Sequence, residues 1–457
     1  MRNRKRDIGI HFIGIGGIGM SGIARIAAEL DYPITGSDLN STQIVSELAS
    51  LGCEIHRGHD VSHLGNPDLV VISSAIDAEN PELKKARELK IPVISRAKML
   101  GILMNSSRGI AIAGTHGKTT TSAMVSTMLE YGGLDPTIVV GGYTHEFNGN
   151  AKLGTGDFFV AEADESDGSL LELNPEIAVI NNIDDDHIDF YGSVEKLHQT
   201  FKKFIEKVPT NGLVAVSIDD PVLNGMRGMF RKNTMTYAIE KDADLNARGI
   251  HEDAFSVTFE VLFRGKPLGE IHLAKPGYFN VYNALAAISV GLHVGMPFIA
   301  IKEALARFSG VKRRFDILKQ TPEITVIDDY AHHPSEIKAT LKSIRTNHSS
   351  RVIGVFQPHR YSRMKHLSDQ FGTCFQYADE VVVSDIYSAG EAPIPFVTSD
   401  LVLDALKRNN QRYVKYIPDI DNIPDYIESR QKKGDLVVTL GAGDVWKVAH
   451  TLAAKGA

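Results

Sequence analysis

The chain contains 457 residues, enough for about three domains at roughly 150 residues each. Apolar residues make up 43 % and charged residues 23 %, an ordinary globular composition that excludes a disordered or collagen-like chain. The formal net charge of −7 argues against nucleic acid as a partner.

No apolar run approaches the roughly 20 residues that span a bilayer, so no membrane partner is expected. Residues 1–6 are basic, but no apolar region of a signal peptide follows them. The two cysteines, Cys53 and Cys374, lie far apart, which excludes a disulfide framework and favours a reducing compartment. The sequence therefore predicts a cytoplasmic globular protein.

Short apolar strands alternate with longer helical stretches, a pattern typical of an α/β fold with parallel strands covered by helices on both faces. The predicted strands include Ile8–Ile13, Leu69–Ile72, Gly109–Ala113, Phe158–Ala161, Ile177–Ile180, Ile324–Ile327, Val352–Phe356, Glu380–Val383 and Leu436–Leu440. One section differs, because Phe255–Phe263 alternates apolar and polar residues, turns at Arg264–Pro267 and returns through Leu268–Leu273. This section predicts a hairpin with one solvated face.

Glycine-bearing turns between strand and helix occur near residues 14, 114 and 441, which indicates three α/β units. The first boundary is expected at the polar break Asn105–Arg108. The second is expected at Ser309–Arg314, after a helix predicted over Val281–Phe308. The predicted domains are residues 1–105, 106–311 and 312–457.

The first glycine turn has the spacing Gly14-x-Gly16-x-x-Gly19, between a strand and a helix predicted over Met20–Leu30, and Asp38 follows about 20 residues later. Glycines let a diphosphate approach the backbone, where a helix N-terminus offers free N–H groups. The motif fits NAD, another nucleoside diphosphate, or only a tight turn. The candidate ligand-binding residues are Gly14, Gly16, Gly17, Gly19 and Asp38.

The second glycine turn is more specific, because a strand leads into Gly-x-x-Gly-Lys-Thr and then into a helix that ends near Tyr131. Backbone N–H groups can cradle a triphosphate, Lys118 can neutralise its oxygens, and the Thr119 hydroxyl can ligate Mg²⁺. The standard P-loop has a glycine where Ile112 stands, and a glycine turn beside an ordinary lysine remains an alternative. The candidate ATP-binding residues here are Gly114, Thr115, His116, Gly117, Lys118, Thr119 and Thr120.

Acidic residues follow two further strands, and ligands of an open parallel sheet lie beyond the carboxyl ends of its strands. Glu162 follows one strand, and the cluster Asp184–Asp189 follows the next. Mg²⁺ prefers oxygen ligands, which Thr119 and Glu162 offer, whereas His187 indicates a second metal site or a substrate contact. Glu165 and Asp185 are interpreted as solvated loop charges.

Taken together, these motifs resemble those of the Mur ligase family, and most closely its alanine-adding members, from Ile10 to Gly443. The residues that carry the resemblance are His11–Gly22, Gly114–Thr120, Glu162–Asp167, Asn182–His187, Gly277–Asn283, Arg313–Asp316, Asp328–Pro334, Phe356–Arg363 and Asp385–Glu391. The resemblance implies a Rossmann-like N-terminal domain for the UDP-substrate, a central P-loop ATPase-like domain, and a Rossmann-like C-terminal domain for the amino acid.

The resemblance also implies a reaction, which is the joining of the lactyl carboxylate of UDP-N-acetylmuramate to L-alanine in peptidoglycan precursor synthesis. ATP would be converted to ADP and phosphate through an acyl phosphate, with two Mg²⁺ ions. Phosphorylation supplies a leaving group that a carboxylate lacks, and the meeting of two anions requires Lys118 and the metal ions to screen them.

Particular roles follow from the resemblance. Lys118 would contact the phosphates, Thr119 and Glu162 would hold one Mg²⁺, and His187 would help to hold the second. Further ATP-site residues would be Asn280, Asn283, Arg314 and Asp329, and the amino-acid-binding residues would be Tyr330, His333, His359, Arg360 and Arg363. Sister ligases use a carbamylated lysine as a metal ligand, but Lys202 and Lys203 are interpreted as helix-surface lysines.

Three alternatives remain open on the sequence. A cell-wall recycling ligase would attach a peptide to the same UDP-sugar on the same scaffold. An NAD-dependent oxidoreductase would use the Gly14 loop and leave Lys118 without a role. A non-catalytic ATP-driven switch would not need the cationic segment His359–Arg363.

Overall fold

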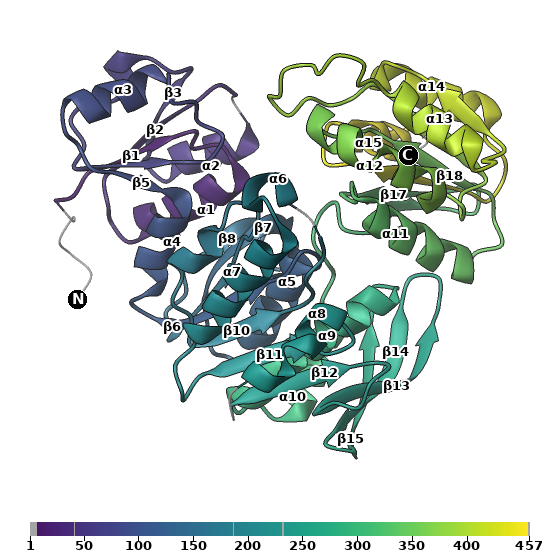
Figure 1. Ribbon diagram of the computed structural model, residues 1–457, viewed down its shortest axis with the longest axis horizontal. Coiled ribbons are helices and arrows are strands. Elements are labelled where there is room, and N and C mark those ends of the chain that lie inside the picture. Colours follow the sequence, from purple (N-terminus) through teal and green to yellow (C-terminus); the bar gives the residue numbers. More distant parts are fainter. Residues whose placement is uncertain (1–6, 41, 186, 231–232, 456–457) are drawn as a thin grey trace. The chain divides into compact units, whose positions relative to one another are not determined.

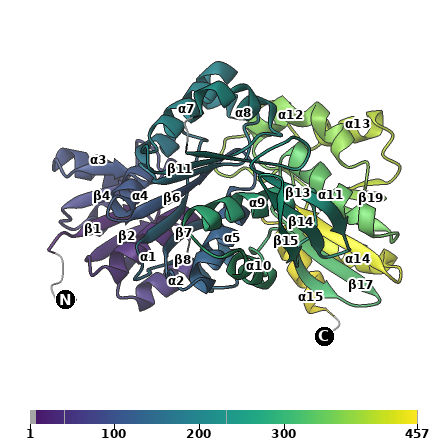
Figure 2. The ribbon, with the colours of Figure 1, turned by 90° about the horizontal axis from the view of Figure 1, so that it is seen from below.

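The computed structural model describes residues 7–40, 42–185, 187–230 and 233–455. The chain forms two compact units. Residues 1–249, 259–272 and 281–308 make up the first unit, and residues 250–258, 273–280 and 309–457 make up the second. Three sheets with covering helices follow one another along the chain (Figures 1 and 2), and the predicted α/β fold class with three domains is confirmed.

The first sheet is wholly parallel, with the strand order β3-β2-β1-β4-β5. Its strands are β1 (Ile10–Ile13), β2 (Ile34–Asp38), β3 (Glu54–Arg57), β4 (Leu69–Ile72) and β5 (Val93–Ser95). Its helices are α1 (Ile18–Glu29), α2 (Gln43–Ser50), α3 (Pro81–Glu88) and α4 (Arg96–Met104), with the 3₁₀ turn η1 (Val61–His63). The order reverses between β1 and β4, and ligands of such sheets bind at this reversal, beyond the carboxyl ends of the strands.

The second sheet has the order β15-β14-β13-β12-β11-β10-β6-β9-β7-β8. Its strands are β6 (Arg108–Ala113), β7 (Thr137–Thr144), β8 (Gly149–Lys152), β9 (Phe158–Glu162), β10 (Ile177–Ile180), β11 (Leu213–Ser217), β12 (Thr234–Ala238), β13 (Leu245–Glu252), β14 (Val257–Phe263) and β15 (Lys266–Leu273). Its helices are α5 (Lys118–Tyr131), α6 (Ile188–Tyr191), α7 (Val194–Glu206), α8 (Pro221–Gly225), α9 (Tyr278–His293) and α10 (Phe298–Arg307), with η2 (Ser169–Glu172) and η3 (Arg227–Met229). β6 lies between β10 and β9 and is parallel to both, so the second glycine turn leaves the middle of the sheet.

The third sheet has the order β16-β17-β21-β18-β19-β20, and β16 is antiparallel to β17. Its strands are β16 (Asp316–Gln320), β17 (Ile324–Asp329), β18 (Val352–Phe356), β19 (Glu380–Val383), β20 (Val414–Tyr416) and β21 (Asp435–Leu440). Its helices are α11 (Pro334–Asn347), α12 (Tyr361–Cys374), α13 (Asp400–Arg408), α14 (Ile423–Arg430) and α15 (Trp446–Ala454), with η4 (Ile420–Asn422). β21 separates β17 from β18, so the loops after these three strands lie side by side.

Two expectations about the elements need correction. The single helix predicted over Val281–Phe308 is wrong, because it is two helices, α9 and α10. Gly295 takes a left-handed φ of +85°, and Pro297 precedes α10 as its N-cap, so the chain turns between them. The predicted hairpin is present, but its turn is shorter than expected, since Arg264 and Gly265 alone bridge β14 and β15, both with positive φ.

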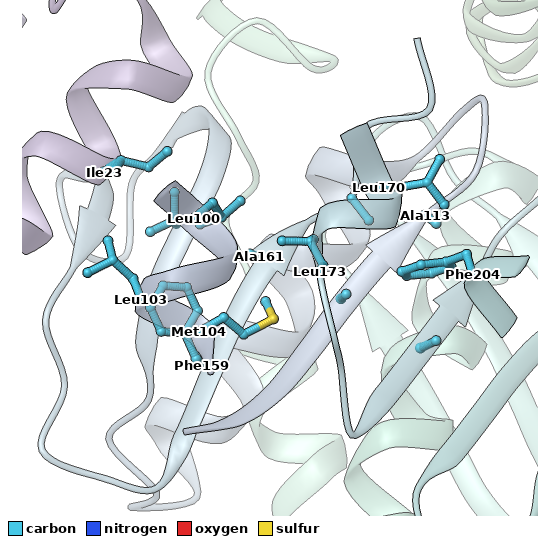
Figure 3. Packing of buried hydrophobic residues seen from close by; sticks show 14 of the residues in the cluster. Ile23, Leu100, Leu103, Met104, Ala113, Phe159, Ala161, Leu170, Leu173 and Phe204 are labelled. Carbon is cyan, nitrogen blue, oxygen red and sulfur yellow. The ribbon is translucent and has the colours of Figure 1, made fainter. Parts of the chain in front are cut away.

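The first two sheets share one hydrophobic core within the first unit. Ile23 of α1 and Leu100 of α4 belong to the same buried cluster as Phe159 of β9 (Figure 3). The same cluster includes Leu170 in η2. Because protein interiors are close-packed, this contact fixes the first glycine turn relative to the strands of the second sheet.

Among the described residues, no helix combines the length and apolar character that crossing a membrane requires.

The packing of α4 on η2 predicts a stability effect at Gly101. A Cβ at Gly101 would lie 2.5 Å from the backbone oxygen of Glu172, so Gly101→Ala should push α4 away and destabilise the protein by about 1–3 kcal/mol. Gly225→Ala is the matched control, since nothing lies within 4 Å of its Cβ position. Thermal unfolding checks the pair, and equal melting temperatures would contradict the assigned packing.

Candidate active site

Hydrogen bonds to neighbouring residues of the chain fix the first glycine turn. The N–H groups of Gly14 and Ile15 donate to the carbonyl of Ser37 at the end of β2. The Asp38 carboxylate accepts from the N–H of Gly16 at 2.8 Å, and a Cβ at Gly16 would lie 2.9 Å from its Oδ2. Gly17 is the N-cap of α1 and carries no side-chain cap, so this helix end suits an anion.

The second glycine turn places Lys118 at the start of α5. Its Nζ donates to the carbonyl of Gly114 at 2.7 Å and to both carboxylate oxygens of Glu165 at 2.8 Å. Burial alone would lower the pKa of Lys118, but the carboxylates of Glu165 and Asp164 outweigh it and raise that pKa. Lys118 therefore keeps a positive charge at neutral pH, as contact with a phosphate requires.

Asparagines from two neighbouring segments of the chain set the shape of this turn. Gly117 has a φ of +80°, and its Cβ would lie 2.5 Å from Oδ1 of the buried Asn283. Asn283 in turn accepts from the Thr121 hydroxyl at 3.0 Å. The N–H of His116 donates to Oδ1 of Asn182 at 2.8 Å. The structure thus places the predicted nucleotide contact Asn283 against the turn itself.

The remaining residues predicted for this site lie nearby or in the second unit. The Thr115 hydroxyl accepts from the N–H of Asp184 at 2.9 Å, and Thr120 is half-buried on α5. Asn280 belongs to the second unit, where it is buried and donates to the carbonyl of Pro276 at 2.7 Å.

Thr119 and Glu162 lie together, as the predicted metal site requires. The Thr119 hydroxyl donates to Oε2 of Glu162 at 3.2 Å, and Glu162 Oε1 accepts from the N–H of Gly141 at 2.5 Å. A hydroxyl beside a carboxylate is a donor set that suits Mg²⁺, which completes its shell with water and phosphate oxygens. Within the described ranges, no three His, Cys, Asp or Glu side chains converge as a set that could hold a metal ion.

Glu165 overturns an expectation, because its interpretation as a solvated loop charge is wrong. Its side chain is 1 % exposed and bonds to Lys118, and its Oε1 lies 3.9 Å from Nε2 of His187. A buried carboxylate needs a partner, and Lys118, which directly follows Gly117 in the second glycine turn, was the available signal. Asp185 is exposed as expected, whereas Asp186 lies outside the described residues.

His187 has an unusual backbone. Its φ of +57° is left-handed, and it is the N-cap of α6. Such a conformation costs a non-glycine residue about 1–3 kcal/mol and concentrates at functional sites. Lys202 and Lys203 are both exposed on α7, which confirms their interpretation as surface lysines.

In the second unit, Arg314 lies within a strained turn that Asp329 contacts. Arg313 and Phe315 have φ values of +62° and +48°. The Asp329 carboxylate accepts from the N–H groups of Phe315 at 3.3 Å and Ala331 at 2.8 Å, and the Arg314 guanidinium stacks 4.9 Å from the centre of the Tyr330 ring. Burial raises the pKa of Asp329 to about 6. Asp329 therefore shapes the turn that presents Arg314.

Several residues predicted to bind an amino acid converge beyond β17 and β18. The His359 ring stacks on Tyr387 with centroids 5.6 Å apart, and its Nδ1 lies 3.1 Å from Nη1 of Arg363. The ring of His332 lies between Tyr330 at 5.4 Å and His359 at 5.8 Å. Burial lowers the pKa of His332 to about 4 and, with the neighbouring His332 and Arg363, that of His359 to about 3. Both rings are therefore neutral at neutral pH, and they lie beside the guanidinium of Arg363, which is always charged.

His332 and Tyr387 belong to this cluster and were not singled out from the sequence. Its predicted neighbour His333 instead is the N-cap of α11 in a capping box with Glu336. Pro334 gave the available signal, because proline at the first helical position makes the preceding residue the N-cap. Arg360 is exposed, with a φ of +69° at the start of α12.

Comparison with known proteins assigns the family. Three domain families match in order, described as the Mur ligase family catalytic domain at residues 9–108, the Mur ligase middle domain at 112–291 and the Mur ligase glutamate ligase domain at 313–443. A protein of Trichlorobacter lovleyi named UDP-N-acetylmuramate–L-alanine ligase is 48 % identical over 97 % of this chain and 98 % of its own length. The chain belongs to the Mur ligase family.

Other Mur ligases agree with this assignment. The relative of the same name from Pelotomaculum thermopropionicum is 47 % identical over 98 % of this chain and 97 % of its own length. Among solved structures, the UDP-N-acetylmuramate–alanine ligase of Thermotoga maritima superposes with a TM-score of 0.85, 30 % identity and coverage of 98 % of this chain and 99 % of that one. A murein peptide ligase of Psychrobacter arcticus gives 0.73, 25 % identity and 98 % of both chains. Membership of this family leaves the oxidoreductase hypothesis without support.

The ion pair of Lys118 and Glu165 predicts a coupled stability effect in this Mur ligase. Lys118→Ala leaves a carboxylate buried without its partner and should cost about 3–5 kcal/mol. The double variant Lys118→Met with Glu165→Gln should recover most of that loss, because neither side chain then carries a charge. Urea unfolding measures both, and a single variant as stable as the wild type would contradict the pairing.

The raised pKa of Asp329 predicts a pH effect on stability. A carboxyl whose folded pKa of about 6 exceeds its unfolded value stabilises the fold fully below about pH 4, and this contribution declines as the pH rises through 6. The decline amounts to about 3 kcal/mol for a shift of about two pKa units.

Urea unfolding of the wild type and of Asp329→Asn at pH 4.5 and pH 7 tests this effect. At pH 4.5 the variant should be less stable than the wild type, because it loses an acceptor. The difference between their free energies of unfolding should be smaller at pH 7, where the wild type has lost the contribution of its carboxyl group. A gap independent of pH would contradict the assignment.

Proposed function

We propose that the chain joins L-alanine to the lactyl carboxylate of UDP-N-acetylmuramate, with ATP converted to ADP and phosphate. The observation that supports this proposal most strongly is the 48 % identity, over nearly the full length of both chains, to a relative named UDP-N-acetylmuramate–L-alanine ligase. The reaction belongs to peptidoglycan precursor synthesis, and so to cell-wall biogenesis, cell shape and division. The buried free thiols of Cys53 and Cys374 suit the cytoplasm, where we place it.

The domains divide the work between them. Residues 1–105 would bind the UDP-substrate on the first glycine turn, where the N-terminus of α1 carries no side-chain cap. Residues 106–311 would bind ATP on the second turn, and residues 312–457 would bind alanine. The Asp38 carboxylate would act by holding Gly16 in place rather than by reading a ribose.

Lys118 is central to the chemistry. A carboxylate expels no good leaving group until its oxygen is phosphorylated, so the lactyl carboxylate must first attack the γ-phosphate of ATP. The attack brings two anions together, and a charged Lys118 lowers that barrier by donating to the phosphate oxygens. Since Lys118 already bonds to Glu165 at 2.8 Å, its ammonium is held in the turn before ATP arrives.

Magnesium fits the oxygen donors of this centre. Thr119 and Glu162 would hold one ion, and His187 would help to hold a second, which supplies positive charge against the phosphates. The chain's own part is to fix Glu162 through the N–H of Gly141 and the Thr119 hydroxyl.

The cluster of the second unit would bind the amino acid. Arg363 offers the forked donors that a carboxylate accepts, and the neutral rings of His332 and His359 add no charge that would repel an ammonium group. A single alanine then attacks the acyl phosphate through its amine, and phosphate leaves.

Phosphate release from ATP tests this function. With UDP-N-acetylmuramate present, each amino acid and the tripeptide of a recycling ligase are supplied in turn. Release that depends on both the UDP-sugar and L-alanine is expected. Release that depends on the tripeptide but not on alanine would establish the recycling alternative.

Arg363 predicts a selective effect on alanine. Arg363→Ala should raise the KM for L-alanine at least tenfold and change that for ATP less than twofold, because the lost guanidinium faces the cluster of His359. Lys365→Ala, an exposed cation on the same helix, is the control. Steady-state kinetics measure the KM values for L-alanine and for ATP in both variants. Equal changes in the two KM values of Arg363→Ala would count against an alanine site at this cluster.

A further inference from the structure

Arg96 stands at an electrostatically unfavourable position. It is the first residue of α4, after the N-cap Ser95, and no acidic residue occurs in that first turn. A cation at a helix N-terminus opposes the helix dipole and costs about 0.3–1 kcal/mol. A residue that breaks a local rule in this way points to a role outside its own helix.

The guanidinium of Arg96 reaches the first glycine turn. Its Nη1 lies 3.0 Å from the position that a Cβ of Gly19 would occupy. Gly19 lies in the first turn of α1, next to the helix end that suits an anion. The third glycine of the motif therefore leaves room for Arg96, because a Cβ at residue 19 would crowd the end of this side chain.

The same side chain reaches the acidic loop after β9. Arg96 Nη2 donates to Oδ2 of Asp164 at 3.4 Å. Asp164 lies between Glu162, which faces Thr119, and Glu165, which holds Lys118. Arg96 is therefore a link between the two turns proposed to bind the UDP-substrate and ATP.

The surroundings of this link are closely packed. α1 and α4 share their core with β9, as Figure 3 shows for Ile23, Leu100 and Phe159. The Asn150 side chain donates to the carbonyl of Ile18 at 2.5 Å, which fastens the start of α1 to β8. Arg96 therefore keeps its place between the glycine turn and the acidic loop.

The guanidinium has donors to spare. It carries five N–H groups, and within the described residues the 3.4 Å contact with Asp164 is its one hydrogen bond. Its side chain is 24 % exposed, so a ligand on the turn can reach it. Forked donors of this kind match phosphate oxygens.

We propose that Arg96 binds the diphosphate of the UDP-substrate on the first glycine turn, while its ion pair with Asp164 holds that diphosphate in register with the loop of Lys118. This inference rests on the proposed function. Without Arg96, the diphosphate would face the carboxylates of Asp164 and Glu162 unscreened. With it, the guanidinium lies between the two sets of negative charge.

Titration calorimetry with UDP and with uridine tests the proposal. Arg96→Ala should weaken UDP binding at least tenfold and leave uridine binding unchanged, because only UDP carries phosphates. Arg96→Lys should lose part of the affinity, since it keeps the charge and lacks the fork. Arg108→Ala is the matched control, an arginine at the start of β6 paired with Glu176 at 2.7 Å, and should bind UDP normally.

Asp164→Asn separates substrate binding from a purely structural ion pair. It breaks the link but keeps the cation, so UDP affinity should stay within twofold while kcat falls. The proposal is overturned if Arg96→Ala and Arg96→Lys bind UDP like the wild type, with melting curves lowered to the same extent as that of Asp164→Asn. A wild-type protein that binds neither UDP nor the UDP-sugar and forms no amide would instead refute the proposed function.

Discussion

The shared core of the first two sheets is the constraint on which the site depends. α1 and α4 bury their apolar faces in the cluster that contains Phe159 and Leu170. A loop carries little packing of its own, so its place is set by the element that it leaves. The turn before α1 and the acidic loop after β9 therefore hold a fixed separation, which two anionic substrates need if they are to react.

Charge is distributed around this core so that each carboxylate has a cation or a donor. Lys118 bonds to Glu165, Arg96 to Asp164, and the N–H of Gly141 to Glu162. Without these partners, burial of the charged carboxylates would cost several kcal/mol in folding free energy. The same arrangement leaves positive charge where phosphates would arrive. The Arg96 guanidinium carries N–H groups beyond the one that donates to Asp164. Lys118 contributes its charge, while its remaining N–H contacts go to the carbonyls of Gly114 and Thr115.

The sequence predicted the sheets better than the site. Continuous apolar runs such as Leu69–Ile72 and Val352–Phe356 coincide in their bounds with strands of the structure. A strand that is covered on both faces needs apolar side chains at every position, so composition is enough to find it. The short strand β3 is among those missed, since Ile55 is its one apolar residue and none of its four residues is buried. Glu165 was misjudged because burial of a charged side chain depends on a partner 47 residues away. His332 was missed because its place in the cluster depends on a ring contact with His359, which is distant in the sequence.

The glycines of the two turns show what such motifs do and do not encode. A Cβ at Gly16 would lie 2.9 Å from Asp38, and one at Gly117 would lie 2.5 Å from Asn283, so each would force its neighbour to shift. A Cβ at Gly19 would crowd the end of the Arg96 side chain at 3.0 Å. The spacing thus records contacts of the protein with itself, which shape a backbone that can then receive a phosphate. The glycine spacing alone does not identify the nucleotide that binds, because the identity of the ligand depends on the side chains that pack beside the glycines. In the first turn the glycines leave room for the carboxylate of Asp38 and the guanidinium of Arg96. A turn with the spacing of a dinucleotide motif is therefore compatible with the UDP-substrate that we propose for it.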